Sequence, residues 1–137
     1  MTTATVYAET NRRRRRITGR DIPKILQDLA NGSKAFLFVY EGDTYVELAA
    51  CKYNTLDDDL FYVEYVGESN WLLGNRAATG KILRLPFMNG EVRVVRDYVV
   101  ASQIVMREAV SNFLLTGTMK DGCYWVRAGD PLLEIPL

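Results

Sequence analysis

Histidine is absent from the 137-residue sequence, and this absence excludes several common kinds of active site. A chain without histidine cannot build a Ser-His-Asp triad, a Cys-His nucleophile or an HExxH zinc site, and it lacks the usual general base near neutral pH. Carboxylates, lysine and tyrosine remain able to transfer protons. The commonest catalytic routes are nevertheless closed, so we expect a protein that is not an enzyme, with no catalytic residue and no cofactor.

Cysteine is scarce as well. The sequence holds only Cys51 and Cys123, which lie far apart and match no CxxC spacing. In a reducing compartment, two such cysteines are usually small apolar residues rather than a disulfide or a metal site. We therefore expect two free thiols and no bound metal.

Long apolar runs are missing from the whole sequence. No run approaches the roughly 18–20 residues that a helix needs to span a bilayer, and five arginines, from Arg12 to Arg16, stand where a secretory signal would have its apolar segment. The sequence therefore predicts a cytoplasmic protein without a membrane segment. Its length fits a single domain, in which 1–17 supply an N-terminal strand and basic segment and 18–137 form the remainder.

The segment 97–126 carries the clearest pattern of the chain. Its apolar residues recur at the i, i+3, i+4, i+7 spacing of a helix with one buried face. Gly117 can close this helix, since only glycine takes a positive φ without a steric penalty, and residues 123–126 then predict a strand. The residues of the expected buried face are Val99, Ser102, Met106, Ala109, Val110 and Phe113.

A shorter helix is expected after Asp21, which is a favourable N-cap residue. Pro23 is tolerated in the first turn, where its missing N–H would be unpaired in any case. The apolar spacing then continues to Leu29, and Asn31-Gly32 ends the helix.

Strand-like runs fill most of the remaining sequence. Residues 34–40, 45–51 and 60–66 predict three strands of an antiparallel meander, and 82–86 with 91–95 predict a hairpin around Met88-Asn89-Gly90. The segment 67–80 reads as a loop or a loop-to-strand transition. The expected fold class is α+β, in which an antiparallel β-sheet meander has two α-helices packed on one face as a second layer.

The five consecutive arginines admit two interpretations. They could form an arm that binds nucleic acid by releasing counterions from phosphates. They could instead belong to a solvated loop or an edge strand, where repeated charge discourages unwanted strand pairing. The formal net charge of the chain is zero, whereas a dedicated nucleic-acid binder usually carries a wider basic surface. We therefore expect nucleic acid to be an unlikely partner.

Acidic residues concentrate between Glu41 and Glu68, where eight acids accompany a single base, Lys52. The three consecutive aspartates from Asp57 to Asp59 could be a solubilising turn or part of an acidic surface that docks a basic protein. They do not follow the EF-hand pattern of a calcium loop. The glycine-rich stretch 74–81 departs from the phosphate-loop spacing, so it does not predict a nucleotide site.

Two short patterns resemble immunity protein family one of bacterial polymorphic toxin systems. The first is Ala-x-x-Ala-Val-x-x-Phe-Leu-x-Thr-Gly followed by a tryptophan, which residues 108–117 and Trp125 match most closely. The second is a small acidic strand, here Asp58-Asp59-Leu60-Phe61-Tyr62-Val63. The resemblance extends from Thr18 to Val126.

The resemblance implies an α+β protein that binds a cognate toxin domain, often a nucleic-acid deaminase, and blocks it in a one-to-one complex during interbacterial competition. A toxin that acts on nucleic acid needs a basic cleft, and an acidic surface with exposed aromatic anchors would complement it. Phe113 and Trp125 are expected in the core. The expected toxin-binding residues are Asp57, Asp58, Asp59, Tyr62, Glu64, Glu68 and Trp71.

Two other functions stay open at the level of sequence. One is a nucleic-acid-binding module that uses the arm from Arg12 to Arg16, whose affinity would fall steeply with salt. The other is an enzyme that uses carboxylates, for example Asp57 and Glu64.

Overall fold

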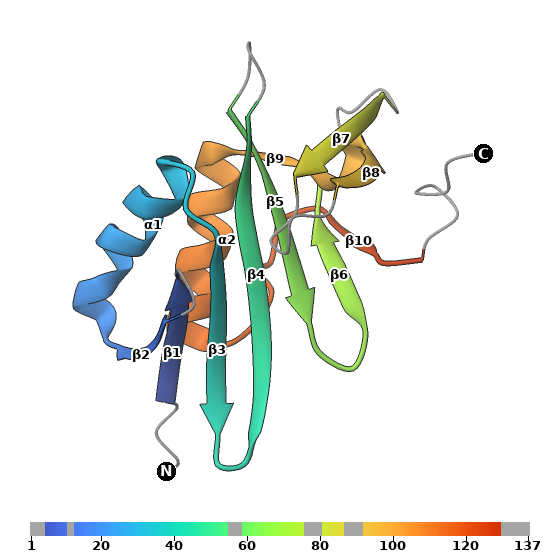
Figure 1. Ribbon diagram of the computed structural model, residues 1–137. Coiled ribbons are helices and arrows are strands. Elements are labelled where there is room, and N and C mark those ends of the chain that lie inside the picture. Colours follow the sequence, from blue (N-terminus) through green and yellow to red (C-terminus); the bar gives the residue numbers. More distant parts are fainter. Residues whose placement is uncertain (1–4, 11–12, 55–58, 76–80, 87–91, 130–137) are drawn as a thin grey trace.

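The computed structural model describes residues 5–10, 13–54, 59–75, 81–86 and 92–129 (Figure 1). Within these ranges the backbone alone is described for 10, 53, 54, 59, 83–86 and 92–97. The elements are β1 (Thr5–Thr10), β2 (Arg13–Ile17), the 3-10 turn η1 (Gly19–Asp21), α1 (Ile22–Ala30), β3 (Ala35–Glu41), β4 (Thr44–Asn54), β5 (Asp59–Val66), β6 (Asn70–Leu73), β7 (Ile82–Pro86), β8 (Val92–Arg96), the 3-10 turn η2 (Asp97–Val99), β9 (Ala101–Ser102), α2 (Gln103–Thr116) and β10 (Trp125–Arg127).

One antiparallel sheet organises the molecule. Its strands follow the order β10-β6-β5-β4-β3-β1-β2, and the short β9 pairs with β5 as its eighth strand. Strands β3, β4 and β5 are neighbours in sequence order, which confirms the predicted three-strand meander, and β6 extends it by one strand. Strands β7 and β8 form a separate hairpin, and its turn residues, Met88-Asn89-Gly90 among them, lie outside the described ranges.

Both helices pack on the same face of the sheet, which confirms the predicted α+β two-layer fold. Figure 1 shows α2 behind β3 and β4, with α1 to its left. The main core lies between these layers, where Leu29 of α1 and Phe113 of α2 meet Leu37, Leu48 and Phe61 of the strands. All five side chains are at most 1% exposed. No described helix is long and apolar enough to cross a membrane.

Helix α2 begins later than the sequence predicts. Ser102 has extended backbone angles (φ −67°, ψ 164°) and its Oγ accepts a hydrogen bond from Val105 N at 3.4 Å, so it is the N-cap and not a helical residue. Val99 lies in η2 and packs in a different apolar cluster. The predicted end is confirmed, because Gly117 has φ 71° and its N–H donates to the Phe113 carbonyl at 2.7 Å. Apolar spacing alone could not separate the turn η2 from the helix that follows it.

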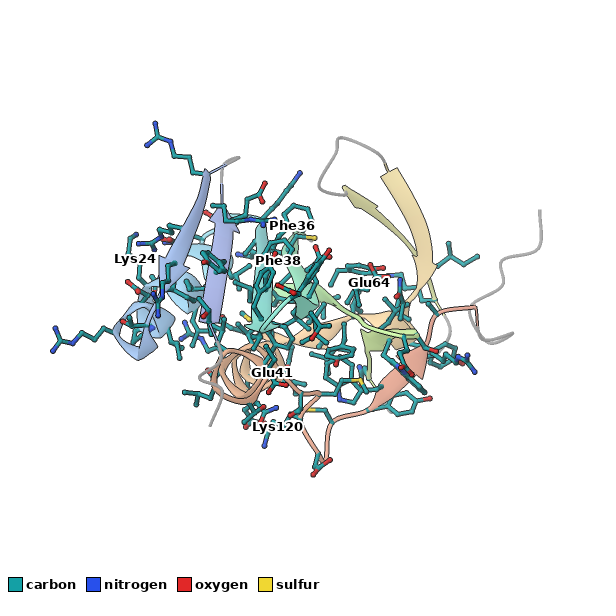
Figure 2. The ribbon with its side chains drawn as sticks, turned by 90° about the horizontal axis from the view of Figure 1, so that it is seen from below. Lys24, Phe36, Phe38, Glu41, Glu64 and Lys120 are labelled. Atoms are coloured by element: carbon teal, nitrogen blue, oxygen red, sulfur yellow. The ribbon has the colours of Figure 1, made fainter. Side chains whose placement is uncertain are left out.

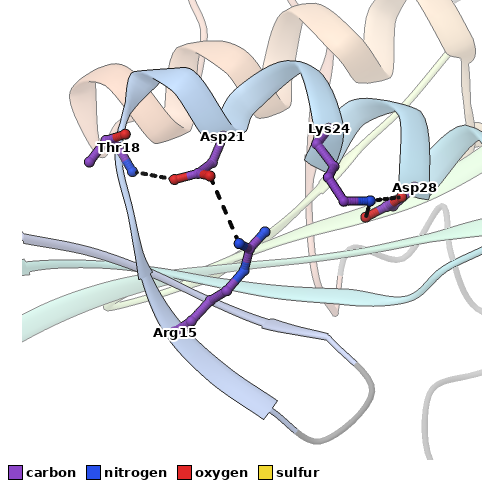
Figure 3. Close-up of polar contacts among 5 residues, drawn as sticks. All are labelled: Arg15, Thr18, Asp21, Lys24 and Asp28. Atoms are coloured by element: carbon purple, nitrogen blue, oxygen red, sulfur yellow. Dashed lines mark hydrogen bonds and ion pairs between the residues drawn. The ribbon is translucent and has the colours of Figure 1, made fainter.

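The predicted start of α1 is confirmed, although Asp21 acts differently from a helix cap. Its Oδ2 accepts a hydrogen bond from Thr18 N at 2.8 Å, and its Oδ1 lies 3.8 Å from Arg15 Nη1 (Figure 3). The carboxylate therefore caps the start of the 3-10 turn η1 and not the start of α1. On the exposed side of α1, Lys24 pairs with Asp28 one turn later, Nζ to Oδ1 3.1 Å. Surface pairs of this kind contribute only about 0.3–0.5 kcal/mol, so the helix is stabilised mainly by its buried apolar side.

The segment 67–80, expected to be a loop or a loop-to-strand transition, contains strand β6 (Asn70–Leu73). Its Trp71 and Leu72 pair with Tyr65 and Glu64 of β5 on one side and with β10 on the other. The strand expected at 123–126 is shorter and lies at Trp125–Arg127. Strand β6 has four residues, which is too few to show a clear alternation of apolar and polar residues in the sequence. It is a strand because it pairs with β5 on one side and β10 on the other.

A second apolar cluster covers part of the face opposite the helices, which we call the front face. Val99 and Val100 pack there on Tyr62 of β5, Leu72 of β6 and Val126 of β10. Gly74 lets the chain around Tyr98 lie close to the end of β6, because a Cβ at position 74 would be only 2.2 Å from the Tyr98 carbonyl oxygen. The cover extends over the β5–β6–β10 half of the sheet and reaches Cys51 of β4.

Candidate functional site

Among the described residues, the front face over β1 to β3 and the first part of β4 has no covering layer, whereas Cys51 of β4 lies under the second cluster. Because side chains alternate along a strand, the strand register places one set from each strand on this side. Figure 2 shows Phe36, Phe38 and Glu64 on the side of the sheet away from α2. We call this set the open surface; it comprises Tyr7, Glu9, Arg14, Arg16, Phe36, Phe38, Tyr40, Tyr45, Glu47 and Glu64.

Four aromatic rings of the open surface contact one another across three strands. Tyr7 meets Tyr40 edge-on, with ring centroids 5.5 Å apart. Tyr40 lies 5.0 Å from Tyr45, and Tyr45 lies 5.8 Å from Phe38. Each such pair is worth about 0.5–1.5 kcal/mol, so the rings hold one another in place. Tyr45 is nevertheless 53% exposed, which leaves a large ordered ring available to a partner.

Arg14 lies flat on this surface. Its guanidinium carbon is 4.2 Å from the centroid of the Phe38 ring, its Nε is 3.4 Å from Glu9 Oε2, and its Nη1 donates to the Tyr40 hydroxyl at 3.4 Å. The stacked arginine covers Phe38, which is only 6% exposed. The open surface thus already holds one cation between an aromatic ring and a carboxylate.

The structure confirms that the arginine run lies in an edge strand. Strand β2 is the last strand of the sheet beside β1, and its arginines alternate between the two faces. Arg14 is held on the front face, whereas Arg15 reaches Asp21 on the helix side. The described arginines therefore do not form one continuous basic surface, which the predicted nucleic-acid arm would need. Arg12 lies outside the described residues.

Glu47 and Glu64 lie diagonally across β4 and β5 on the open surface. Glu47 pairs with Val66 and Glu64 pairs with Ala49, two register positions apart in the same pair of strands. Burial raises the pKa of Glu47; the nearby Glu64 raises this pKa further, Arg14 opposes the increase, and Glu9 adds to it. Glu64 Oε2 also accepts from Asn70 Nδ2 at 3.5 Å. Glu47 therefore carries its negative charge at a cost that Arg14 does not fully offset.

This cost gives a pH-dependent effect on stability. Because the folded pKa of Glu47 is raised above its ordinary value of 4.5, its ionisation destabilises the fold above that pKa, and the penalty disappears as the carboxyl takes up a proton. Glu47→Gln should therefore raise the melting temperature at pH 7 by about 1–2 °C, a small gain because the group is partly exposed to solvent. Thermal melts from pH 7 down to pH 4 should show the gain vanishing. An equal gain at both ends would contradict this role.

The structure does not bring the predicted toxin-binding residues together. Asp57 and Asp58 lie outside the described residues; Asp59 starts β5, and only its backbone is described there, paired with Asn54. Glu68 is exposed in the turn after the other end of β5. The length of β5 separates Asp59 from Glu68 by roughly 25 Å, so the two ends form separate surfaces.

The expectation that Tyr62 is an exposed anchor is wrong. Its ring does point to the front face, but it is 2% exposed because Val99 and Val100 cover it. Trp71 is half-buried and shares the helix side with Tyr65. Of the predicted residues whose side chains are described, Glu64 alone belongs to the open surface.

The sequence contained a signal for the open surface that its interpretation missed. In β3 the residues Phe36, Phe38 and Tyr40 alternate with Leu37 and Val39, so both faces of this strand are apolar. A strand with two apolar faces needs cover on both, yet the structure provides a helix layer on one side only.

The described residues contain no group of three metal-ligating side chains. Cys51 and Cys123 are not joined by a disulfide, and burial raises the pKa of the Cys123 thiol. A comparison of the sequence with models of known protein families finds no match, and a search of curated proteins finds no relative.

Proposed function

We propose that this protein acts in the cytoplasm as an immunity protein, binding and neutralising a cognate bacterial toxin domain in a one-to-one complex. The observation that carries the proposal is the open surface. A sheet face that carries a half-exposed tyrosine and three carboxylates (Glu9, Glu47 and Glu64) against two arginines (Arg14 and Arg16) is suited to binding a protein. The resemblance of residues 18–126 to the immunity family supports a toxin as the partner.

Aromatic side chains and charges contribute differently to such a complex. A ring that is already ordered, such as that of Tyr45, loses little conformational freedom on binding and can act as an energetic anchor. Acidic groups such as Glu47 and Glu64 accelerate the encounter with a basic partner more than they tighten the final complex. A nucleic-acid deaminase has to present a basic surface to its substrate, so an acidic and aromatic surface is complementary to it.

The test uses the polypeptide encoded immediately upstream of this protein. Co-expression should restore growth that this polypeptide alone abolishes, and calorimetric titration should show a one-to-one complex with a nanomolar Kd. Base conversion in a nucleic-acid substrate should stop when an equimolar amount of the protein is added. Absence of both heat and rescue would overturn the proposal, and a salt series with DNA and RNA would then examine β2.

A further inference from the structure

A cavity of about 290 Å³ lies between the β3–β4 hairpin and the C-terminal end of α2. Figure 2 looks along this end of the molecule and shows Glu41 beside the coil of α2. In the β3–β4 register Val39 and Val46 share the helix side with Leu37 and Leu48, so the cavity lies on that side of the sheet. It meets the open surface only at Tyr45, near the tip of the hairpin. Its lining consists of Val39, Glu41, Thr44, Tyr45, Val46, Thr116, Gly117 and Thr118.

The charge of this cavity is negative. Glu41 supplies a carboxylate, and the C-terminal end of a helix carries a partial negative charge from its last carbonyl groups. The eight lining residues include no lysine or arginine. The cavity therefore favours a positively charged group.

The walls are ordered by hydrogen bonds within the chain. Thr116 Oγ1 lies 2.7 Å from both the Asn112 carbonyl and Thr118 Oγ1, and Asn112 Nδ2 donates to the Thr118 carbonyl at 2.9 Å. Across the cavity, Thr44 Oγ1 donates to the Glu41 carbonyl at 3.0 Å. A cavity shaped in this way needs little rearrangement to accept a side chain, which lowers the cost of binding.

The remaining walls are apolar. Val39 and Val46 contribute aliphatic surface, and Tyr45, the residue before Val46 in β4, also lines the cavity. Gly117 allows α2 to end close to the sheet, since a Cβ there would lie 3.1 Å from Val39 Cγ1. Long basic side chains pack their methylene groups on such surfaces while the charged end stays in a polar environment.

We propose that this cavity receives a lysine or arginine side chain of the protein that binds the open surface. The aliphatic part of that side chain packs on Val39 and Val46, and its charge lies at Glu41 and the end of α2. The inference rests on the proposed function, because the side chain belongs to the bound toxin domain. It adds a defined basic anchor to the complex, which the partner reaches from the open surface around the tip of the β3–β4 hairpin.

Two variants test the cavity against the upstream-encoded polypeptide. Glu41→Gln removes the charge without changing shape, and Thr118→Lys supplies a cation from the chain itself that competes for the cavity. Each should weaken the complex by roughly 10-fold or more, as expected for a desolvated charge contact. The matched controls are Glu108→Gln on α2 and Gln27→Lys on α1, which make the same charge changes elsewhere on exposed positions and should stay within about 2-fold.

The outcomes separate the cavity from the proposed function. If the wild type binds and both cavity variants bind equally well, the cavity inference is overturned and the proposed function stands. If the wild type does not bind, the proposed function fails, and NMR titration with tetra-arginine and tetra-glutamate peptides decides the cavity. Amide shifts at Glu41, Tyr45 and Thr118 with the basic peptide alone support it. Shifts spread over all acidic residues, or none, overturn it. Thermal melts of each variant verify that it is folded.

Discussion

Phe113→Ala should lower the free energy of unfolding by about 3–5 kcal/mol. Phe113 is 1% exposed, and its ring meets the Tyr65 ring edge-on with centroids 6.0 Å apart, so it joins α2 to β5. Removing the ring leaves a cavity in the main core between the layers and forfeits this contact. Since a domain of this size is stable by only about 5–15 kcal/mol, this is the largest loss of stability expected from one substitution.

Urea denaturation followed by circular dichroism measures this loss. The matched control is Leu115→Ala, two positions along the same helix, where the side chain is 71% exposed. That control should change the free energy of unfolding by less than about 0.5 kcal/mol. If both variants unfolded at the same urea concentration, Phe113 would not hold the helix layer on the sheet.

The double variant Tyr45→Ala and Glu47→Lys should weaken binding of the upstream-encoded polypeptide by roughly 100-fold, about 2.7 kcal/mol. The first change removes the exposed ring that serves as an anchor, and the second reverses a charge that attracts a basic partner. Most of the loss from Tyr45→Ala should appear as faster dissociation, whereas Glu47→Lys should slow association and reduce its dependence on salt.

A matched pair on the other layer provides the control for this effect. Ile104→Ala and Glu108→Lys remove an exposed apolar side chain and reverse an exposed charge on α2, where Ile104 is 72% exposed. Surface plasmon resonance should give rate constants for this pair within about 2-fold of the wild type. Equal losses for the two pairs would show that general charge, and not the open surface, determines the affinity.

The two-layer fold was readable from the sequence because its signals are local. The repeat at Met106, Ala109 and Phe113 marks the buried side of α2, and Gly117 ends the helix where expected. The helix start was misplaced because Val99 continues the same spacing by coincidence, although it packs on the opposite side of the sheet. Position in the sequence does not tell which face of a sheet a residue covers.

The candidate surface was harder to predict for the same reason. Alternation along β5 correctly placed Tyr62 and Glu64 on one side of the sheet, but it could not show that residues 98–100 cover Tyr62 and leave Tyr45 accessible. The cover is a contact between segments more than thirty residues apart. The high number of acidic residues from Glu41 to Glu68 suggested one acidic surface. The structure separates them, because the acids at the two ends of β5 lie far apart.

The pairing of Arg14 likewise depends on tertiary structure. The run of arginines indicated an exposed basic segment, yet the pairing of β1 with β2 and β3 brings Arg14 over Phe38 and beside Glu9. One cation of the run is thereby held by an aromatic ring and a carboxylate of its own chain. The same combination of ring and carboxylate recurs at Tyr45 and Glu47, where we expect the cation to come from the partner.

The most direct test of the open surface is an NMR titration of the ¹⁵N-labelled protein with the unlabelled upstream-encoded polypeptide. If the open surface is the binding site, the largest amide shifts should fall on β1, β3 and β4, around Tyr7, Phe38, Tyr45 and Glu47. Amides along the outer side of α1 should remain unchanged. Shifts confined to α1 and α2, or their absence at saturating partner, would contradict the binding role of the open surface.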